Sequence, residues 1–290
     1  SFSTRNHSST EVEKLNSKDS FVHSESPVGS KSGKNMILTV VGGSARVHLV
    51  LFVASLQCVN IELAAILRVI TLDKNAHEDC LKLLSNKQCE KRFQILPTEN
   101  ELAKLRHPST RLRFTYLRAL WGKVDLQREE VQKHPNSFIT FVDIDTVFLR
   151  DPMEAILRYP QNVLVSPNHL YRREFNTGFI SHAPGTNIVD MWQRKKKEFM
   201  RLDVLRHDQD AFSELESLGA FENILVLGNC TELASACCCH YTRQLAGGCS
   251  NEHIVPFLYH AACVEPRSRK ADILKHVWQQ LGPIVCTIQR

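Results

Sequence analysis

The chain has 290 residues, 43% hydrophobic and 23% charged, a composition that excludes collagen-like, wholly disordered and small disulfide-only proteins. Lysine and arginine number 36 against 31 aspartate and glutamate residues, which gives a formal charge of +5. Because this charge is modest and no dense basic stripe accompanies it, we expect no nucleic-acid partner, whereas a small anionic substrate remains possible.

Residues 1–34 contain ten serines and almost no aliphatic side chains. Such a segment cannot bury enough apolar surface to offset the entropy lost on ordering, so we predict a disordered linker or stem. The sequence has no apolar run of about 20 residues that would cross a membrane. We therefore expect membrane contact only through an anchor absent from this chain.

Apolar runs rich in β-branched residues alternate with amphipathic segments from residue 35 onwards. They predict strands at 36–41, 67–72, 92–96, 138–142, 163–165 and 177–181. Alternation of this kind predicts one α/β domain over residues 35–290, in which helices cover both faces of a mainly parallel sheet.

Four of the expected helices contain or precede candidate functional residues. The first begins near Ala45, after the turn Gly42-Gly43. The second is capped by Ser109 or Thr110 and has one apolar face, made by Leu112, Tyr116, Leu117 and Leu120. The third spans 187–200, with lysines 195–197 on its solvated side, and the fourth begins at Asp208.

Two aspartates, Asp143 and Asp145, directly follow the predicted strand 138–142. Residues two apart on an extended chain point the same way, so their carboxylates converge and repel each other unless a cation lies between them. Hard oxygen ligands suit Mg²⁺ or Mn²⁺, and ligands bind beyond the carboxyl ends of the strands in such sheets. The pattern therefore predicts a metal site, the structural alternative being a pair of acidic turn residues.

Several motifs follow one another in a fixed order along residues 36–281. They are Ile37-Leu38-Thr39-Val40-Val41, Thr71-Leu72-Asp73, Trp121-Gly122-Lys123, Asp143-Ile144-Asp145, Asn176-Thr177-Gly178-Phe179, Asp208-Gln209-Asp210 and His260-Ala261. In this order they resemble the nucleotide-diphospho-sugar transferases, which implies a GT-A-like (Rossmann-like) fold. The resemblance also implies that Asp143, Asp145 and His260 hold Mn²⁺ or Mg²⁺ against the donor diphosphate.

The same resemblance implies which residues contact the donor and the transferred sugar. The donor-binding residues would be Val41, Asp73, Arg118, Lys123, Asp143, Asn176 and Gly178. Asp208 and Gln209 would be the catalytic residues. The structural alternatives are an ordinary Asn/Gly turn at 176–178, solvated basic side chains on a helix, and an N-cap at Asp208.

The implied activity is hexosyl or pentosyl transfer from a nucleotide-diphosphate sugar, UDP-linked, to a hydroxyl of a glycan or glycoprotein. Relatives with these motifs retain the anomeric configuration. We expect front-face attack, in which the departing diphosphate takes the acceptor proton while Asp208 and Gln209 orient the sugar. Double displacement through a residue of segment 208–210 is the alternative.

Two other functions fit part of the pattern. In a haloacid-dehalogenase-type phosphatase Asp143 would be the nucleophile and Asp145 the acid or base, but that motif normally opens its domain and a long structured stretch precedes it here. The second alternative function is that of a non-catalytic relative that binds a nucleotide sugar or a carbohydrate. It is suggested by Ala262-Cys263, since many relatives carry asparagine after the histidine and alanine.

Ten cysteines are many for a reducing compartment. Together with the glycosylation sequons at Asn6 and Asn229 they favour a glycoprotein of the Golgi or another secretory lumen, with the cytoplasm as the alternative. We expect the Cys-rich segment 230–249 to be a disulfide-stapled loop. A zinc site and free thiols are the alternatives there, although adjacent cysteines point their side chains apart.

Overall fold

The computed structural model describes residues 33–167, 175–201, 203–221, 223–227, 233–235, 256–262, 264 and 269–288, the side chains of 167, 234, 235 and 282–288 excepted. The predicted linker at 1–34 and the predicted Cys-rich loop at 230–249 lie mostly outside these residues.

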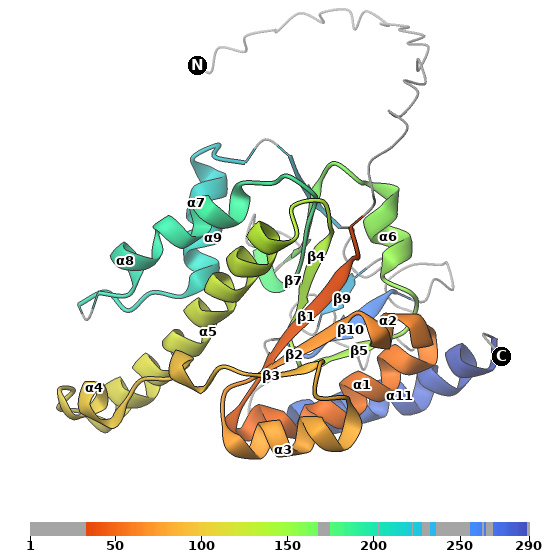
Figure 1. Ribbon diagram of the computed structural model, residues 1–290, viewed down its shortest axis with the longest axis horizontal. Coiled ribbons are helices and arrows are strands. Elements are labelled where there is room, and N and C mark those ends of the chain that lie inside the picture. Colours follow the sequence, from red (N-terminus) through yellow and green to blue (C-terminus); the bar gives the residue numbers. More distant parts are fainter. Residues whose placement is uncertain are drawn as a thin grey trace, which may run out of the picture. The chain divides into compact units, whose positions relative to one another are not determined.

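A seven-stranded sheet forms the centre of the domain, in the order β3-β2-β1-β4-β7-β6-β8 (Figure 1). Its strands are β1 (Met36–Val41), β2 (Leu67–Thr71), β3 (Cys89–Lys91), β4 (Ile139–Val142), β6 (Val163–Pro167), β7 (Phe175–His182) and β8 (Ile224–Val226). All neighbours pair in parallel except β7, which runs antiparallel to both β4 and β6. The predicted mainly parallel sheet is confirmed.

A second sheet of three short strands lies next to the site. It has the order β5-β10-β9, with β5 at Thr146–Phe148, β9 at Leu233–Ser235 and β10 at Leu258–His260. β10 pairs antiparallel with β5, so that His260 faces Thr146 in the register. This pairing carries a residue from late in the chain to the segment that directly follows Asp145.

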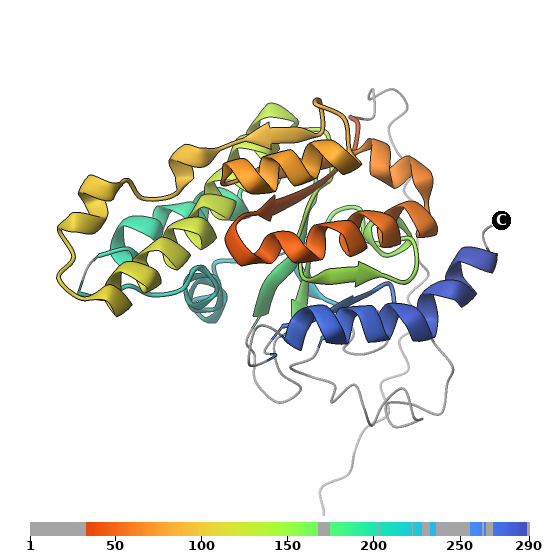
Figure 2. The same cartoon turned by 90° about the horizontal axis from the view of Figure 1, so that it is seen from below.

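Helices cover both faces of the central sheet, as expected (Figures 1 and 2). They are η1 (Gly43–His48), α1 (Leu49–Val59), α2 (Ile61–Ala65), α3 (Lys74–Leu83), η2 (Phe93–Ile95), α4 (Glu99–Ala103), α5 (Pro108–Lys133), α6 (Met153–Arg158), α7 (Ile188–Arg194), α8 (Lys196–Phe199), α9 (Asp208–Ser217) and α11 (Arg269–Ile288). Among the described residues, none of these helices is long and apolar enough to span a membrane.

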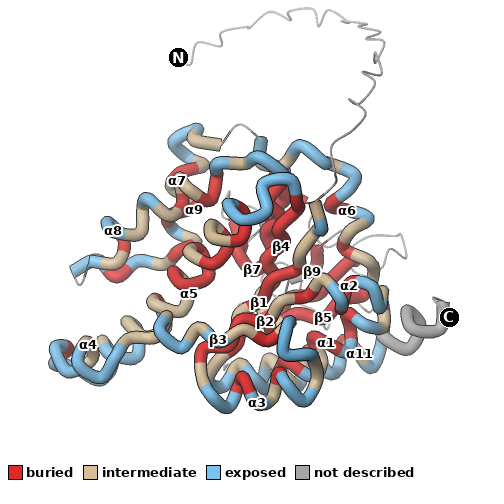
Figure 3. The backbone as a smooth tube through the Cα atoms, in the orientation of Figure 1, coloured by how far each residue is buried: buried red, intermediate tan, exposed pale blue. Residues whose placement is uncertain are grey.

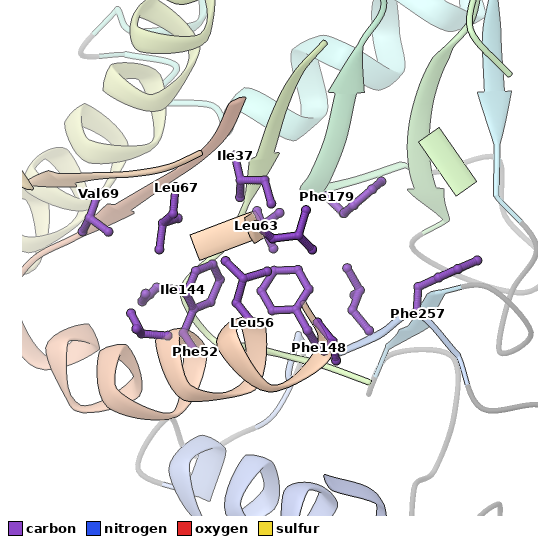
Figure 4. Close-up of a cluster of buried hydrophobic side chains, with 14 of the residues drawn as sticks. Ile37, Phe52, Leu56, Leu63, Leu67, Val69, Ile144, Phe148, Phe179 and Phe257 are labelled. Carbon is purple, nitrogen blue, oxygen red and sulfur yellow. The ribbon is translucent and has the colours of Figure 1, made fainter. Parts of the chain in front are cut away.

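Strand alternation divides the apolar side chains between two cores. On β1, Ile37 belongs to a cluster with Phe52 of α1, whereas its neighbour Leu38 belongs to a cluster with Trp121 of α5 (Figure 4 shows the first). Both strand residues are wholly buried. Since β1 and β4 are covered on both faces, all of β4 and four of the six residues of β1 are buried (Figure 3), which is typical of a parallel sheet.

Charged side chains fasten α5 to the edge of the sheet. Glu130 is 2% exposed and lies 2.6 Å from Arg68 of β2 and 3.2 Å from Lys133. Arg92 joins the neighbouring Glu129 at 2.7 Å. This network fixes the helix that carries Lys123.

The predicted third strand at 92–96 is wrong. The strand is β3, Cys89–Lys91, and residues Phe93–Ile95 form the 3₁₀ turn η2. The N–H of Arg92 donates to the carbonyl of Thr71, the last residue of β2. Beyond that point β2 offers no further backbone partner, so the extended chain ends.

The predicted start and apolar face of the second helix are also wrong in part. The helix begins at Pro108, after His107 as N-cap, because proline has no N–H to leave unbonded in the first turn. Leu112 is 75% exposed and Tyr116 41%, whereas Leu117 is buried together with Trp121. Figure 1 shows the reason, since the first turns of α5 extend past the sheet.

The segment predicted as one helix at 187–200 forms two, α7 and α8, which meet at Lys195. Its lysines are not all solvated as expected. Lys195 pairs with Glu214 at 2.7 Å, and Lys196 pairs with Asp125. Both are about a quarter exposed, because α9 and α5 pack against this segment.

A disulfide joins Cys80 at the end of α3 to Cys89 of β3. This cross-link between residues nine positions apart lowers the conformational entropy of the unfolded chain. We expect the double variant Cys80→Ser/Cys89→Ser to lower the free energy of unfolding by about 2–3 kcal/mol in urea titrations. Rapid alkylation of both cysteines in the native, non-reduced protein would contradict the assignment.

Candidate metal centre

Strand β4 delivers the two aspartates to the carboxyl edge of the sheet. All four residues of β4 are buried, and the chain leaves the sheet at Asp143, whose N–H donates to the carbonyl of Gly178 at 2.7 Å. Asp145 follows directly before β5. The side chain of Asp143 is 30% exposed and that of Asp145 is 14% exposed, so both carboxylates are partly accessible.

His260, the last residue of β10, completes a three-residue cluster with these aspartates. Its Nε2 lies 3.7 Å from Oδ2 of Asp143 and 3.3 Å from Oδ1 of Asp145. The backbone holds this geometry, because the N–H of Ala261 donates to the carbonyl of Asp145 at 2.9 Å. One ligand atom from each of the three residues lies within 4.8 Å of the others.

The donor set fits a divalent cation. Two carboxylate oxygens and one neutral imidazole nitrogen are ligands that Mn²⁺ and Mg²⁺ accept, and three protein ligands leave further coordination positions for substrate oxygens. The predicted residues Asp143, Asp145 and His260 therefore form a possible metal site.

Gly178 of β7 keeps the space in front of this cluster open. A Cβ atom at this position would lie 2.2 Å from Cε1 of His260 and 2.7 Å from Oδ2 of Asp143. The N–H of Gly178 donates to Oδ1 of Asn176 at 2.8 Å. This hydrogen bond holds the buried Asn176 side chain against β7. Asn176 and Gly178 thus lie beside the aspartates, and their contact with a donor sugar stays a prediction.

Lys123 of α5 reaches the same site from the opposite direction. Its side chain is 4% exposed, and its ammonium group lies 3.6 Å from Asp143 and 3.3 Å from Asp208. Burial alone would lower the pKa of Lys123, but the charges of Asp143 and Asp208 outweigh burial and raise it above its ordinary value. Lys123 is therefore a fixed cation of the site.

The first residue of α9, Asp208, has no exposed surface. Its Oδ2 accepts a hydrogen bond from Thr177 at 3.2 Å, and its Oδ1 lies 2.8 Å from Nδ1 of His207. Burial would raise the pKa of Asp208, but Lys123 and His207 lower it to about 2. The N-cap of the helix is His207, so the structural alternative of Asp208 as N-cap is wrong.

Gln209 lies at the surface of this cluster. It is half-buried, and its Oε1 accepts the N–H of Thr177 at 3.3 Å. Its amide NH₂ group offers two hydrogen-bond donors in addition. Of the two residues expected to be catalytic, Gln209 is thus the one with accessible surface.

Lys270 belongs to the site, although the sequence analysis did not include it. The ammonium group of Lys270, in the first turn of α11, lies 2.5 Å from Oδ2 of Asp145. Burial lowers the pKa of His48, while the charge of Asp145 acts to raise it and that of Lys270 to lower it.

Burial by itself would raise the pKa of Asp145. His260 and Lys270 outweigh it and hold the pKa of this carboxyl well below its usual range. Asp145 therefore stays ionised and able to bind a cation.

Three predicted donor-binding residues are not drawn into this cluster. Val41 is wholly buried in the core, and its carbonyl accepts the N–H of Leu72. Asp73 caps α3 and also accepts the N–H of Gly43 at 2.6 Å, at the carboxyl end of β2. Arg118 donates to the carbonyl of Ile95 and lies 3.9 Å from Glu101. Their contact with a donor stays a prediction.

Comparison with known proteins identifies the family. A family model described as nucleotide-diphospho-sugar transferase matches residues 65–270, and the chain belongs to this family. No curated protein sequence matches the chain. The family match leaves the phosphatase interpretation without support.

Solved structures share the fold at low sequence identity. The galactosyltransferase LgtC, in complex with donor and acceptor sugar analogues, is 14% identical, with a TM-score of 0.50 over 84% of this chain and 95% of LgtC. A glycosyltransferase involved in glycosylating the major capsid of PBCV-1 is 12% identical, with a TM-score of 0.49 over 83% and 98%. Mouse xyloside xylosyltransferase 1 is 12% identical, with a TM-score of 0.44 over 79% and 98%. The likeness to LgtC confirms the GT-A-like fold.

The crowding around Gly178 gives a test of the metal site. We expect Gly178→Ala to weaken Mn²⁺ binding about tenfold or more, measured by calorimetry, because the new methyl group displaces His260 or Asp143. Asp203→Asn is the control, since it changes an exposed side chain that pairs with Arg201 and lies outside the cluster. Equal Mn²⁺ affinity for Gly178→Ala and the unmodified protein would contradict the assigned cluster.

Proposed function

We propose that this chain is a metal-dependent, retaining glycosyltransferase that moves a sugar from a UDP-linked donor to a hydroxyl of a glycan or glycoprotein. The observation that carries the proposal is the convergence of Asp143, Asp145 and His260 at the carboxyl end of β4. Family membership supports it, and so does the likeness to LgtC, a galactosyltransferase that binds donor and acceptor sugar analogues.

Asp143, Asp145 and His260 would hold the ion. When bound there, Mn²⁺ or Mg²⁺ would neutralise the donor diphosphate and stabilise it as a leaving group. Lys123 fixes the Asp143 carboxylate at 3.6 Å, so little rearrangement is needed when the donor arrives. Gly178 lets the donor approach the backbone of β7, and the Gln209 amide can donate to a sugar hydroxyl.

Burial of Asp208 favours front-face attack over double displacement. A nucleophile must reach the anomeric carbon, whereas the Asp208 carboxylate is enclosed by Lys123, Thr177 and His207. Asp210 is engaged as well, since its Oδ2 accepts the N–H of His207 at 3.1 Å. Asp208 then acts as a positioning residue through Lys123, and the departing diphosphate is left to take the acceptor proton.

The first test is metal dependence. We expect release of UDP from a panel of UDP-sugars to require Mn²⁺ or Mg²⁺, and Asp145→Asn to lower it at least about 100-fold because one of two anionic ligands is lost. Asp203→Asn is the matched control, since Asp203 is 63% exposed and pairs only with Arg201 in the described contacts. Full release in excess chelator would contradict the proposal, and tight UDP-sugar binding without release would favour the non-catalytic alternative.

The second test concerns stereochemistry. We expect NMR of the first product to show the anomeric configuration of the donor, because in front-face attack the acceptor enters on the side that the diphosphate leaves. Asp208 is buried and the exposed Asp210 accepts the N–H of His207 in the helix cap, so neither is placed to act as the nucleophile of a double displacement. An inverted linkage would overturn the retaining mechanism. A glycosylated peptide spanning residues 207–212, trapped during turnover, would replace front-face attack with double displacement.

We also propose a secretory-pathway lumen as the compartment. The Cys80–Cys89 disulfide supports an oxidising environment, and Cys58 is disulfide-bonded as well. Mass spectrometry of protein from a eukaryotic secretory host should then find glycan on Asn229. An unmodified Asn229 together with free Cys80 and Cys89 would favour the cytoplasm.

A further inference from the structure

Lys270 contacts one carboxylate oxygen of Asp145. Its Nζ lies 2.5 Å from Oδ2, while Oδ1 of the same carboxylate is 3.3 Å from Nε2 of His260. Both oxygens of a residue assigned as metal ligand are therefore engaged. A divalent cation that binds Asp145 must do so against the positive charge of this ammonium group.

Local structure holds Lys270 in this place. It lies in the first turn of α11, where the helix dipole disfavours a cation, so the position is stabilised mainly by Asp145. The helix itself is anchored, because Leu274 and Val277 pack on Val147 of β5 and Tyr259 of β10. These two strands carry or adjoin Asp145 and His260, so Lys270 and the metal ligands form one unit.

The net charge of the site indicates how the contact between Lys270 and Asp145 would affect the binding of a metal ion. The joined ion pairs contain three carboxylates, on Asp143, Asp145 and Asp208, and two ammonium groups, on Lys123 and Lys270. With neutral histidines, the cluster carries one negative charge. A divalent ion alone turns it positive, whereas a divalent ion with a diphosphate, one negative charge on each phosphoryl group, restores the original balance.

We propose that Lys270 makes metal binding depend on the nucleotide, so that the site takes up the ion together with the donor diphosphate and not alone. This inference rests on the proposed function and adds a positioning residue to it. Lys270 is 21% exposed on a flexible four-carbon stem, so it can leave Asp145, while Lys123 at 4% exposed stays fixed.

The experiment measures the dissociation constant of Mn²⁺ by calorimetry, with and without saturating UDP. We expect the unmodified protein to bind Mn²⁺ about tenfold or more tightly with UDP than without it, since one neighbouring charge changes ion affinity by this order. In Lys270→Met, Mn²⁺ alone should bind about tenfold or more tightly than in the unmodified protein, and the gain from UDP should shrink. Lys270→Arg should keep the coupling, because it keeps the charge.

Lys275→Met is the matched control, on the exposed side of the same helix, and should leave both constants unchanged. If Lys270→Met does not fold, as judged by its thermal melt, Lys270→Gln replaces it. Unchanged Mn²⁺ affinity in the neutral variant, or an equal gain in Lys275→Met, overturns the role of Lys270 and leaves the proposed function standing. Absence of Mn²⁺ binding by every variant, with and without UDP, overturns both.

Discussion

Asp143 and Asp145 repel each other at the end of a buried strand, and the rest of the site is arranged around that repulsion. Lys123 lies 3.6 Å from the first carboxylate and Lys270 lies 2.5 Å from the second. The two lysines come from α5 and α11, which lie on different sides of the central sheet (Figure 1). The core that contains Trp121 supports α5, and a separate apolar cluster of Leu274 and Val277 with β5 and β10 supports α11.

The two cations differ in how firmly they are held. Lys123 and Asp208 form a buried ion pair, whose desolvation cost is offset only because Thr177 and His207 contact the same carboxylate. Such an arrangement specifies one geometry. Lys270 is more exposed and has one ion-pair partner in the described contacts, so its position responds to what else enters the site. A rigid and a movable cation suit a site that holds a charged leaving group and later releases it.

The reversal of β7 brings the second half of the site into place. Because β7 runs antiparallel to β4, Phe179 pairs with Val142, and the residues just before Phe179 lie beyond the carboxyl end of β4. Asn176, Thr177 and Gly178 are therefore next to Asp143, and Thr177 links them to Asp208. In a wholly parallel sheet, the C-terminal end of the neighbouring strand would lie at this position in place of the N-terminal part of β7.

The sequence by itself determined the parts of this protein that depend on local chemistry. The alternation of apolar runs and amphipathic segments predicted the mainly parallel sheet, and the spacing of Asp143 and Asp145 placed two carboxylates on one side of an extended chain. The order of motifs then indicated His260 as the third ligand. The sheet and the carboxylate pair follow from backbone periodicity and from the ligand preferences of a hard cation, whereas the role of His260 was implied by the resemblance to a known family.

Only the tertiary structure decided which partners lie across the sheet. It buried Asp208 completely, exposed Leu112 and Tyr116 where α5 extends past the sheet, and ended β3 where β2 offers no further partner. It also brought Lys270 to Asp145, a pair 125 positions apart in the chain. No local pattern encodes such a contact, because it arises from the packing of α11 on β5 and β10, and burial and charge pairing are properties of that packing.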